Sequence, residues 1–144
     1  MKVISSASEM KMISSDARAR RQRIIFVPTM GALHEGHLAL LREGRRRGDI
    51  LVASIFVNPT QFTRREDFEK YPHHLPSDLK KCEGEKVDIV FVPSVEEMYP
   101  LGEKELKARL PEVASPLEGI SRPGHFSGVL QIVSKLFRII QPDE

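Results

Sequence analysis

The sequence predicts an α/β protein with a parallel sheet covered by helices on both faces. Three apolar, β-branched segments indicate buried strands, over residues 24–27, 50–57 and 87–92. None of them alternates cleanly between apolar and polar residues, which is typical of strands buried on both faces. Segments with helix signals separate them, so right-handed crossovers give a Rossmann-like, doubly wound arrangement.

Helix signals fall before, between and after these strands. Ser6 and Glu9 have the spacing of a capping box, and Gly48 provides a stop for the second helix. From Phe126 to Ile140 apolar side chains recur at i, i+3, i+4 and i+7, the pattern of an amphipathic helix. Residues 100–122 have no clear period, and we expect a short strand, a short helix and a loop there. The expected helices cover residues 6–21, 35–47, 76–86, a short segment from 94, and 126–140.

Composition and charge narrow the class of protein. The 144 residues are 40% hydrophobic and 29% charged, which excludes a disordered tail or a membrane bundle. A net charge of +2 is too balanced for nucleic acid as the main partner. No secretory signal is visible, and no apolar run reaches the ~18–20 residues of a membrane span. We expect a soluble, cytoplasmic protein that binds neither nucleic acid nor membrane.

The length fits one nucleotide-binding catalytic domain over residues 1–144. The chain stops where an alternating fold begins its next strand, so a truncated protein is expected. The arginine runs at 18–23 and 45–47 fit solvated helix ends, because cations suit helix C-termini.

The loop after the first strand carries the strongest chemical signal. Gly31 permits a close backbone approach, and the following helix offers free N–H groups that suit phosphate. His34 and His37 are three residues apart, so they share one face if both are helical. Two imidazoles there can donate hydrogen bonds to a triphosphate as charge builds on phosphorus. Helix capping and zinc binding remain alternatives for this pair, although no Cys or carboxylate completes an obvious zinc site.

Several segments, in order and in register, resemble the pantothenate synthetase family. They are PTMGALHEGH (28–37), SIFVNPTQF (54–62), YP (71–72), PSVEEMYP (93–100), LEGISRPGHFSGV (117–129) and KLFRIIQPD (135–143). His34-Glu35-Gly36-His37 also looks like the HxGH signature of the wider nucleotidyltransferase superfamily. The resemblance covers the N-terminal half of the family's chain. It implies a ligase that joins pantoate to β-alanine through a pantoyl adenylate, using ATP and Mg²⁺, in a homodimer.

The resemblance also assigns roles to individual positions. His34 and His37 match the catalytic histidines, and Gln61 and Asn58 match the region that binds pantoate and β-alanine. Tyr71, Asp78, Arg122 and His125 are placed in the surroundings of the active site, and the metal ligands remain unknown. The residues that match the ATP-binding loop are Met30, Gly31, Ala32, Leu33, His34, Glu35, Gly36 and His37.

Two departures from the family pattern bear on activity. His73 and His74 follow Tyr-Pro where the family usually has Arg, so a fixed guanidinium charge is replaced by groups that titrate near neutrality. The family's Lys-Asp and Ser-Ser-Arg segments, which contact the ATP phosphates, fall outside residues 1–144. We therefore expect this chain alone to be weak or inactive as a ligase.

Three alternative functions stay open at this point. The chain is another HxGH nucleotidyltransferase acting on a different acid, a non-catalytic nucleotide-binding module, or a small metal-binding protein. The last would use His34, His37, His73 and His74 as ligands.

Overall fold

The computed structural model of the chain describes residues 1–61, 69–70, 72–101 and 125–144. Four strands form one sheet in the order β1-β4-β3-β2, and every neighbouring pair is parallel. This confirms the predicted α/β class. The strands are β1 (Lys2–Ile4), β2 (Ile24–Thr29), β3 (Ile50–Ile55) and β4 (Ile89–Phe91).

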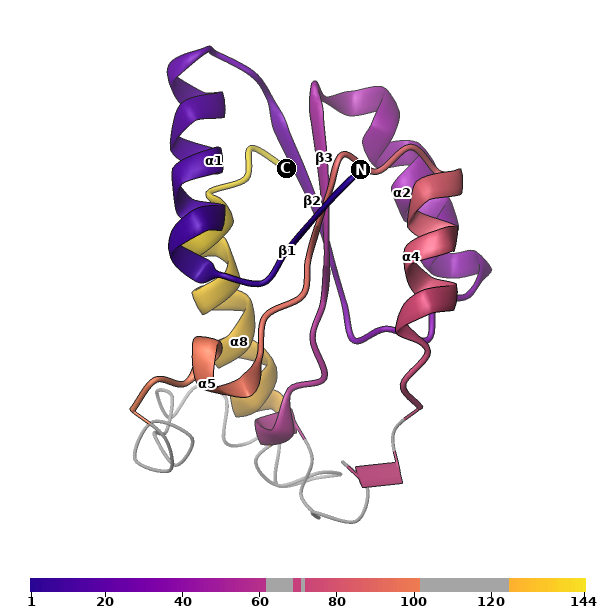
Figure 1. Cartoon of the computed structure of the whole chain (residues 1–144), viewed down its shortest axis with the longest axis vertical. Helices are drawn as coiled ribbons and strands as arrows, with labels where there is room; N and C mark the ends of the chain where they lie inside the picture. The colour runs from indigo at the N-terminus through magenta and orange to yellow at the C-terminus, as the bar shows by residue number, and fades with distance from the viewer. Residues whose placement is uncertain (62–68, 71, 102–124) are drawn as a thin grey trace.

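The helices cover both faces of this sheet, as a doubly wound fold requires (Figure 1). Helices α1 (Ala7–Ala19) and α8 (His125–Ile140) lie on one face, and α2 (Glu35–Arg47) and α4 (Leu75–Gly84) lie on the other. The short helix α5 (Val95–Met98) follows β4, and one turn of 3₁₀-helix, η1 (Pro59–Gln61), follows β3. All strands therefore end on the same edge, which is the lower edge in Figure 1.

The two faces share the core between them. Along β3, Val52 and Phe56 pack with α1 and α8, whereas Leu51 and Ala53 pack with α2 and α4. Because both faces are covered, apolar residues follow one another along a strand. This is the physical reason for the missing polar alternation in the sequence.

The first two strands differ from the prediction made from the sequence. Strand β1 was not predicted, because three residues carry too little periodicity to be recognised. Strand β2 continues through Pro28 to Thr29 beyond the predicted end at residue 27. The N–H of Phe26 points to the outer edge of the sheet, where it bonds Glu144. Pro28 has the same orientation two residues later, so its missing N–H removes no bond to β3.

The amphipathic helix at 126–140 is confirmed, and its buried stripe differs in part from the predicted one. Ile132, Leu136, Ile139 and Ile140 are buried. Phe137 was assigned to that stripe, yet it is 48% exposed and meets the ring of Phe26 edge-on. Of the region without a clear period, 102–122 lies outside the described residues.

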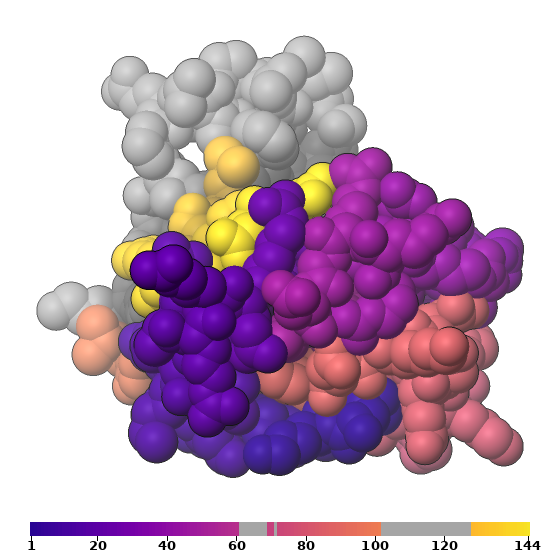
Figure 2. Space-filling model, turned by 90° about the horizontal axis from the view of Figure 1, so that it is seen from above, coloured from indigo at the N-terminus to yellow at the C-terminus, as the bar shows by residue number. Residues whose placement is uncertain are grey.

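The arginine runs make ion pairs at the edge opposite the carboxyl ends of the strands. Arg18 pairs with Asp143, and Arg23 and Arg47 pair with Glu144. Glu144 also accepts from Phe26 N–H and donates to the Ile24 carbonyl, the pattern of parallel pairing. Figure 2 shows these C-terminal residues, in yellow, between the N-terminal segment and the α2 side of the molecule. Within the described part of the chain, no helix is long and apolar enough to cross a membrane.

Candidate active site

The turn from β2 to α2 is held by hydrogen bonds from its first residue onward. Thr29 Oγ1 donates to the Ser54 carbonyl on β3 (2.7 Å) and accepts from the Gly31 N–H (3.1 Å). Gly31 has φ 82° and Ala32 has φ 51°, so two successive residues are left-handed. A Cβ on Gly31 would lie 3.1 Å from Asp78 Oδ2 and 3.2 Å from Ile55, which leaves room only for glycine.

Helix α4 contacts the same turn from the side. The buried carboxylate of Asp78 accepts the N–H groups of Ala32 (2.9 Å) and Leu33 (2.8 Å). Lys81, one turn further along α4, donates from Nζ to the Leu33 carbonyl (2.7 Å). The sequence placed Asp78 only in the surroundings of the site, and it did not single out Lys81.

His34 and His37 form a reciprocal cap at the start of α2. His34 is the N-cap residue, and its Nδ1 accepts the Gly36 N–H (3.0 Å). The His34 N–H donates to Nδ1 of His37 (3.2 Å), and the two ring centroids are 4.1 Å apart. The sequence predicted a shared helical face, but His34 has extended backbone and the rings meet through capping. The structure therefore shows the capping alternative for this pair, and the chemical role stays a prediction.

This cap fixes which ring nitrogen carries the proton. Because Nδ1 of each ring accepts a backbone N–H, each neutral ring carries its proton on Nε2. Burial lowers the pKa of His37, and the neighbouring His34 lowers it further, while Asp78 acts in the opposite direction. His37 is therefore a neutral imidazole at neutral pH, with Nε2–H as its hydrogen-bond donor.

Gly36 is required by the His34 ring. A Cβ at position 36 would lie 2.8 Å from Cε1 and 3.0 Å from Nδ1 of that ring. The ring covers the start of the helix only because the residue beneath it has no side chain. Gly36 was predicted only as a member of the ATP-binding loop, because this packing is visible only in three dimensions.

An apolar cavity lies beside His37, between the end of β2 and α8. Its volume is about 310 Å³, which suits a small organic acid. Among the described residues that line it, His37 and Thr29 have polar side chains and the others are apolar. We call it the His37 cavity; its lining residues are Pro28, Thr29, Met30, His37, Phe56, Val129, Ile132, Val133 and Leu136.

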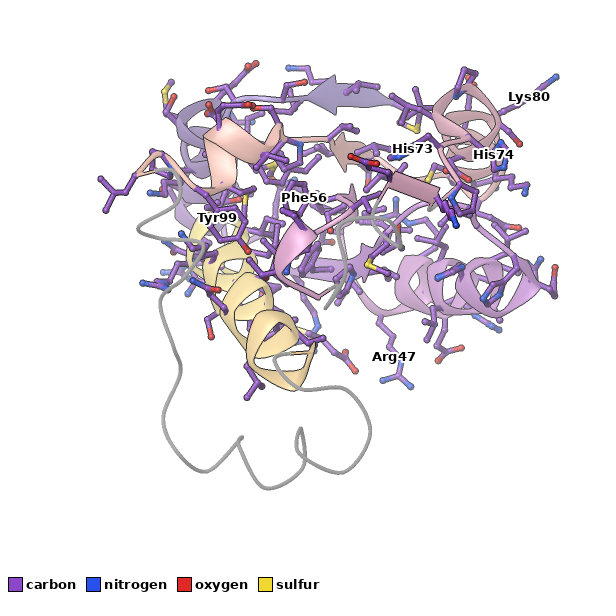
Figure 3. The ribbon with its side chains drawn as sticks, turned by 90° about the horizontal axis from the view of Figure 1, so that it is seen from below. Arg47, Phe56, His73, His74, Lys80 and Tyr99 are labelled. Carbon is purple, nitrogen blue, oxygen red and sulfur yellow. The ribbon has the colours of Figure 1, made fainter. Side chains whose placement is uncertain are left out.

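A second cavity of about 250 Å³ lies across the ends of β3 and β4. The loops that follow β2, β3 and β4 meet in its wall through Gly31, Val57 and Val92. His73 and His74 line it near the start of α4, on the opposite side of the site from Tyr99 and α8 (Figure 3). They therefore line a different cavity from His37.

Asn58 anchors the wall of the site and does not face the His37 cavity. Its side chain is fully buried, with Oδ1 accepting from Tyr99 OH (2.7 Å) and Thr60 N–H (3.2 Å). Its Nδ2 donates to the Gly128 carbonyl on α8 (3.1 Å). Both polar groups of the Asn58 side chain thus bond within the protein, and its contact with substrate stays a prediction. Tyr99, which the sequence did not single out, lies beside Phe56 and α8 (Figure 3).

The remaining predicted site residues are only partly visible. Gln61 ends η1, and His125 begins α8, but their side chains lie outside the described residues. Tyr71 and Arg122 lie outside them entirely. Within the described ranges, no group of three or more His, Cys, Asp and Glu side chains is placed to hold a metal ion.

The parallel sheet, the strand-to-helix turn and the histidine-capped helix define a Rossmann-like nucleotidyltransferase fold. A family model described as pantoate-beta-alanine ligase matches residues 2–144. The chain belongs to this family.

Curated relatives and solved structures agree with the family assignment. The pantothenate synthetases of Pelobacter propionicus and Thermotoga neapolitana are 52% and 51% identical to the chain, over 99% of its length and 50% of theirs. The crystal structure of a Francisella tularensis pantoate-beta-alanine ligase, complexed with beta-gamma ATP and beta-alanine, matches with a TM-score of 0.88. It is 40% identical, over 99% of this chain and 54% of that one. The chain thus spans about half the length of these relatives.

Proposed function

We propose that this chain is the carboxylate-activating part of an ATP-dependent ligase that joins pantoate to β-alanine. The observation that carries the proposal is the reciprocal cap, which occupies Nδ1 of both rings and leaves their Nε2–H groups outside the cap, with His37 in the wall of the His37 cavity. Family membership and the similarity to a structure complexed with ATP and β-alanine support the choice of substrates.

The His37 cavity suits pantoate by its shape and polarity. Pantoate carries two methyl groups on its central carbon, and the wall from α8 is formed by Val129, Ile132, Val133 and Leu136. Burial of methyl groups against such a wall is favourable. With its methyl groups toward α8, the carboxylate faces the β2–α2 turn and the ATP phosphates at the start of α2.

In the first step a pantoate carboxylate oxygen attacks the α-phosphorus of ATP. The bond from that phosphorus to the oxygen shared with the β-phosphate breaks, and pyrophosphate leaves. Negative charge builds on the phosphoryl oxygens, where the neutral His37 Nε2–H and the helix N-terminus stabilise it. Within the turn, the N–H groups of Gly31, Ala32 and Leu33 already have protein acceptors. The Met30 N–H forms no hydrogen bond with a described residue. We therefore assign to it the role of hydrogen-bond donor to the reacting oxygens.

In the second step the amine of β-alanine attacks the acyl carbon of the adenylate. The acyl carbon–oxygen bond to AMP breaks, AMP leaves with the bonding electrons, and the amine loses a proton. AMP is a far better leaving group than oxide, which is why the acid is activated first. Mg²⁺ belongs to the proposal as the ion that accompanies the triphosphate, since phosphate oxygens and water are its usual ligands. Gln61 as a substrate ligand, the homodimer and the cytoplasmic location remain predictions.

Pantoate-dependent exchange of pyrophosphate into ATP tests the first step. The assay compares this chain and the longest form of the protein, each with pantoate and with a panel of other small acids. Exchange that requires pantoate supports the proposal, and exchange that follows another acid assigns a different nucleotidyltransferase. We expect the longer form to be the more active one. Absence of exchange in both forms refutes the proposal.

Two substitutions at one position separate the histidine's capping role from its chemical role. In His37→Asn the amide oxygen replaces Nδ1 as acceptor for His34, but the outer donor is lost. We expect exchange to fall about 100-fold. His37→Gln can place an N–H near the Nε2 position, so we expect a smaller loss. Arg46→Gln, at the other end of α2, is the control. Equal activity of all three variants contradicts the role of the His37 donor.

A further inference from the structure

The turn that precedes the histidine pair is an unfavourable backbone conformation. Gly31 and Ala32 both have positive φ, and the left-handed region is sterically unfavourable for a residue with a side chain such as Ala32. Such a conformation persists only where its surroundings hold it. Leu33, the next residue, is buried in the core under α2 and α4, and His34 follows it directly as the helix cap.

Asp78 supplies that hold. Its two carboxylate oxygens accept the N–H groups of two successive residues, Ala32 and Leu33, so the turn forms a small anion-binding concavity. The anion that fills it is a side chain of the protein itself. Among the described residues no Lys or Arg forms an ion pair with Asp78, although its side chain is 1% exposed. A buried carboxylate bonded to backbone N–H groups is tolerated because these bonds satisfy it.

Lys81 completes the contact from the next turn of α4. Its Nζ donates to the Leu33 carbonyl, so both the N–H and the carbonyl of Leu33 bond α4 side chains. Leu33, the residue that leads into His34, is therefore held at both of its backbone polar groups. Asp78 is also electrostatically coupled to the His37 ring, because the carboxylate counteracts the two effects that lower the pKa of His37.

We propose that Asp78 is a positioning residue for the histidine pair. It holds the backbone of residues 31–33 in the conformation that lets His34 cap α2 and donate its N–H to His37. The inference rests on the proposed function, which makes the direction of the two Nε2–H groups important. Asp78 lines the second cavity and not the His37 cavity, so it acts through the turn.

The test uses Asp78→Asn, which keeps the size of the side chain. The amide oxygen can accept one of the two N–H groups, but its NH₂ group faces the other, and the charge is lost. Glu83→Gln, an exposed carboxylate on the same helix, is the matched control. Asp78→Glu keeps the charge and both acceptor oxygens on a longer stem, so partial rescue is expected. Lys81→Gln perturbs the bond to the Leu33 carbonyl and leaves the carboxylate of Asp78 unchanged. It serves as the second variant if Asp78→Asn does not fold.

The first readout is the imidazole NMR spectrum of this chain, which needs no enzymatic activity. In Asp78→Asn we expect a lower pKa for His37, and for both rings a mixture of tautomers in place of the single Nε2–H form. We expect Lys81→Gln to broaden the His34 signals without lowering the pKa of His37. Ring pKa values and tautomers identical to those of Glu83→Gln would overturn the inference.

The second readout is pyrophosphate exchange by the longest form of the protein. We expect Asp78→Asn to lower kcat by about tenfold or more while KM for pantoate changes less, since misplaced catalytic groups cost rate more than binding. Unchanged kcat in a folded variant contradicts the inference. If the wild-type protein shows no exchange at all, the proposed function fails, and the NMR readout still decides whether Asp78 positions the rings.

Discussion

The two walls of the His37 cavity are built in different ways. The β2–α2 turn is held by hydrogen bonds to its own backbone, from Thr29, Asp78 and Lys81. The α8 wall is apolar along the cavity and is fixed at one end by the buried cluster around Asn58. The β2–α2 turn determines the directions of the hydrogen-bond donors, and the α8 wall determines the volume of the cavity. Changes in the α8 wall should therefore lower stability, whereas changes in the turn should alter the geometry of the histidines.

Asn58→Ala gives the largest expected effect. It removes the partner of Tyr99 OH, the Thr60 N–H and the Gly128 carbonyl in a place without access to water. Leaving buried polar groups unsatisfied should lower the free energy of unfolding by about 3 kcal/mol, measured by urea denaturation. Tyr99→Phe removes only one of these bonds and should cost about 1 kcal/mol. A stable Asn58→Ala protein that loses only pantoate affinity would return Asn58 to direct substrate binding.

Gly128→Ala tests the same wall through packing. The new Cβ would lie 2.3 Å from the Thr60 carbonyl oxygen, and that backbone is held by Asn58 and cannot move away easily. Overpacking of about 1–3 kcal/mol opposes a gain of about 1 kcal/mol in helix propensity, so we expect a net loss of up to about 2 kcal/mol.

Gly84→Ala is the matched control for Gly128→Ala. It lies at the end of α4 with no atom within 4 Å of the new Cβ. This variant should be neutral or slightly more stable in the same thermal or urea unfolding experiment. A Gly128→Ala protein as stable as Gly84→Ala would show that α8 shifts freely against η1.

Gly36→Ala makes the corresponding change in the turn wall. Here the clash is with the His34 ring, a side chain that can rotate away, so stability should change by only about 0.5 kcal/mol. The ring then loses its bond to the Gly36 N–H, and its NMR signals should show a mixture of tautomers. Pyrophosphate exchange should fall far more than stability does. A large loss of stability with an intact His34 tautomer contradicts the proposed difference between the walls.

The sequence predicted the parts of this molecule that depend on local patterns. The Ser6 cap, the Gly48 stop and the amphipathic helix at 126–140 were all placed within a few residues of their observed positions. The histidine pair was recognised because its spacing and its place after a strand are both visible in the chain. Local pattern therefore fixes where the helices begin and which loop carries the chemistry.

The roles of Asp78 and Asn58 depend on contacts that no local pattern contains. Asp78 bonds residues 45 and 46 positions away, and Asn58 bonds a carbonyl 70 positions away. Asn58 follows a strand in a segment that resembles substrate-binding sequences, so its burial was not expected. The conformation of Ala32 is likewise invisible in the sequence, because alanine rarely adopts positive φ without an external hold.

The smallest effect is a pH dependence that isolates His37. Its pKa in the folded protein is lower than in the unfolded chain, chiefly because the ring is partly buried and secondly because His34 is close. Below the unfolded value of about 6.5, the unfolded chain binds a proton more readily than the folded protein does. The stability contributed by the neutral ring is therefore complete above that pH, and it declines as the pH falls toward the lower pKa of the folded protein.

The variant His37→Asn tests this pH dependence, because it keeps the acceptor for the His34 N–H but cannot titrate. Between about pH 7 and pH 5, we expect urea denaturation to show a larger loss of stability for the wild-type protein than for His37→Asn. If the free energy of unfolding depends on pH equally in both proteins, the folded environment leaves His37 unperturbed.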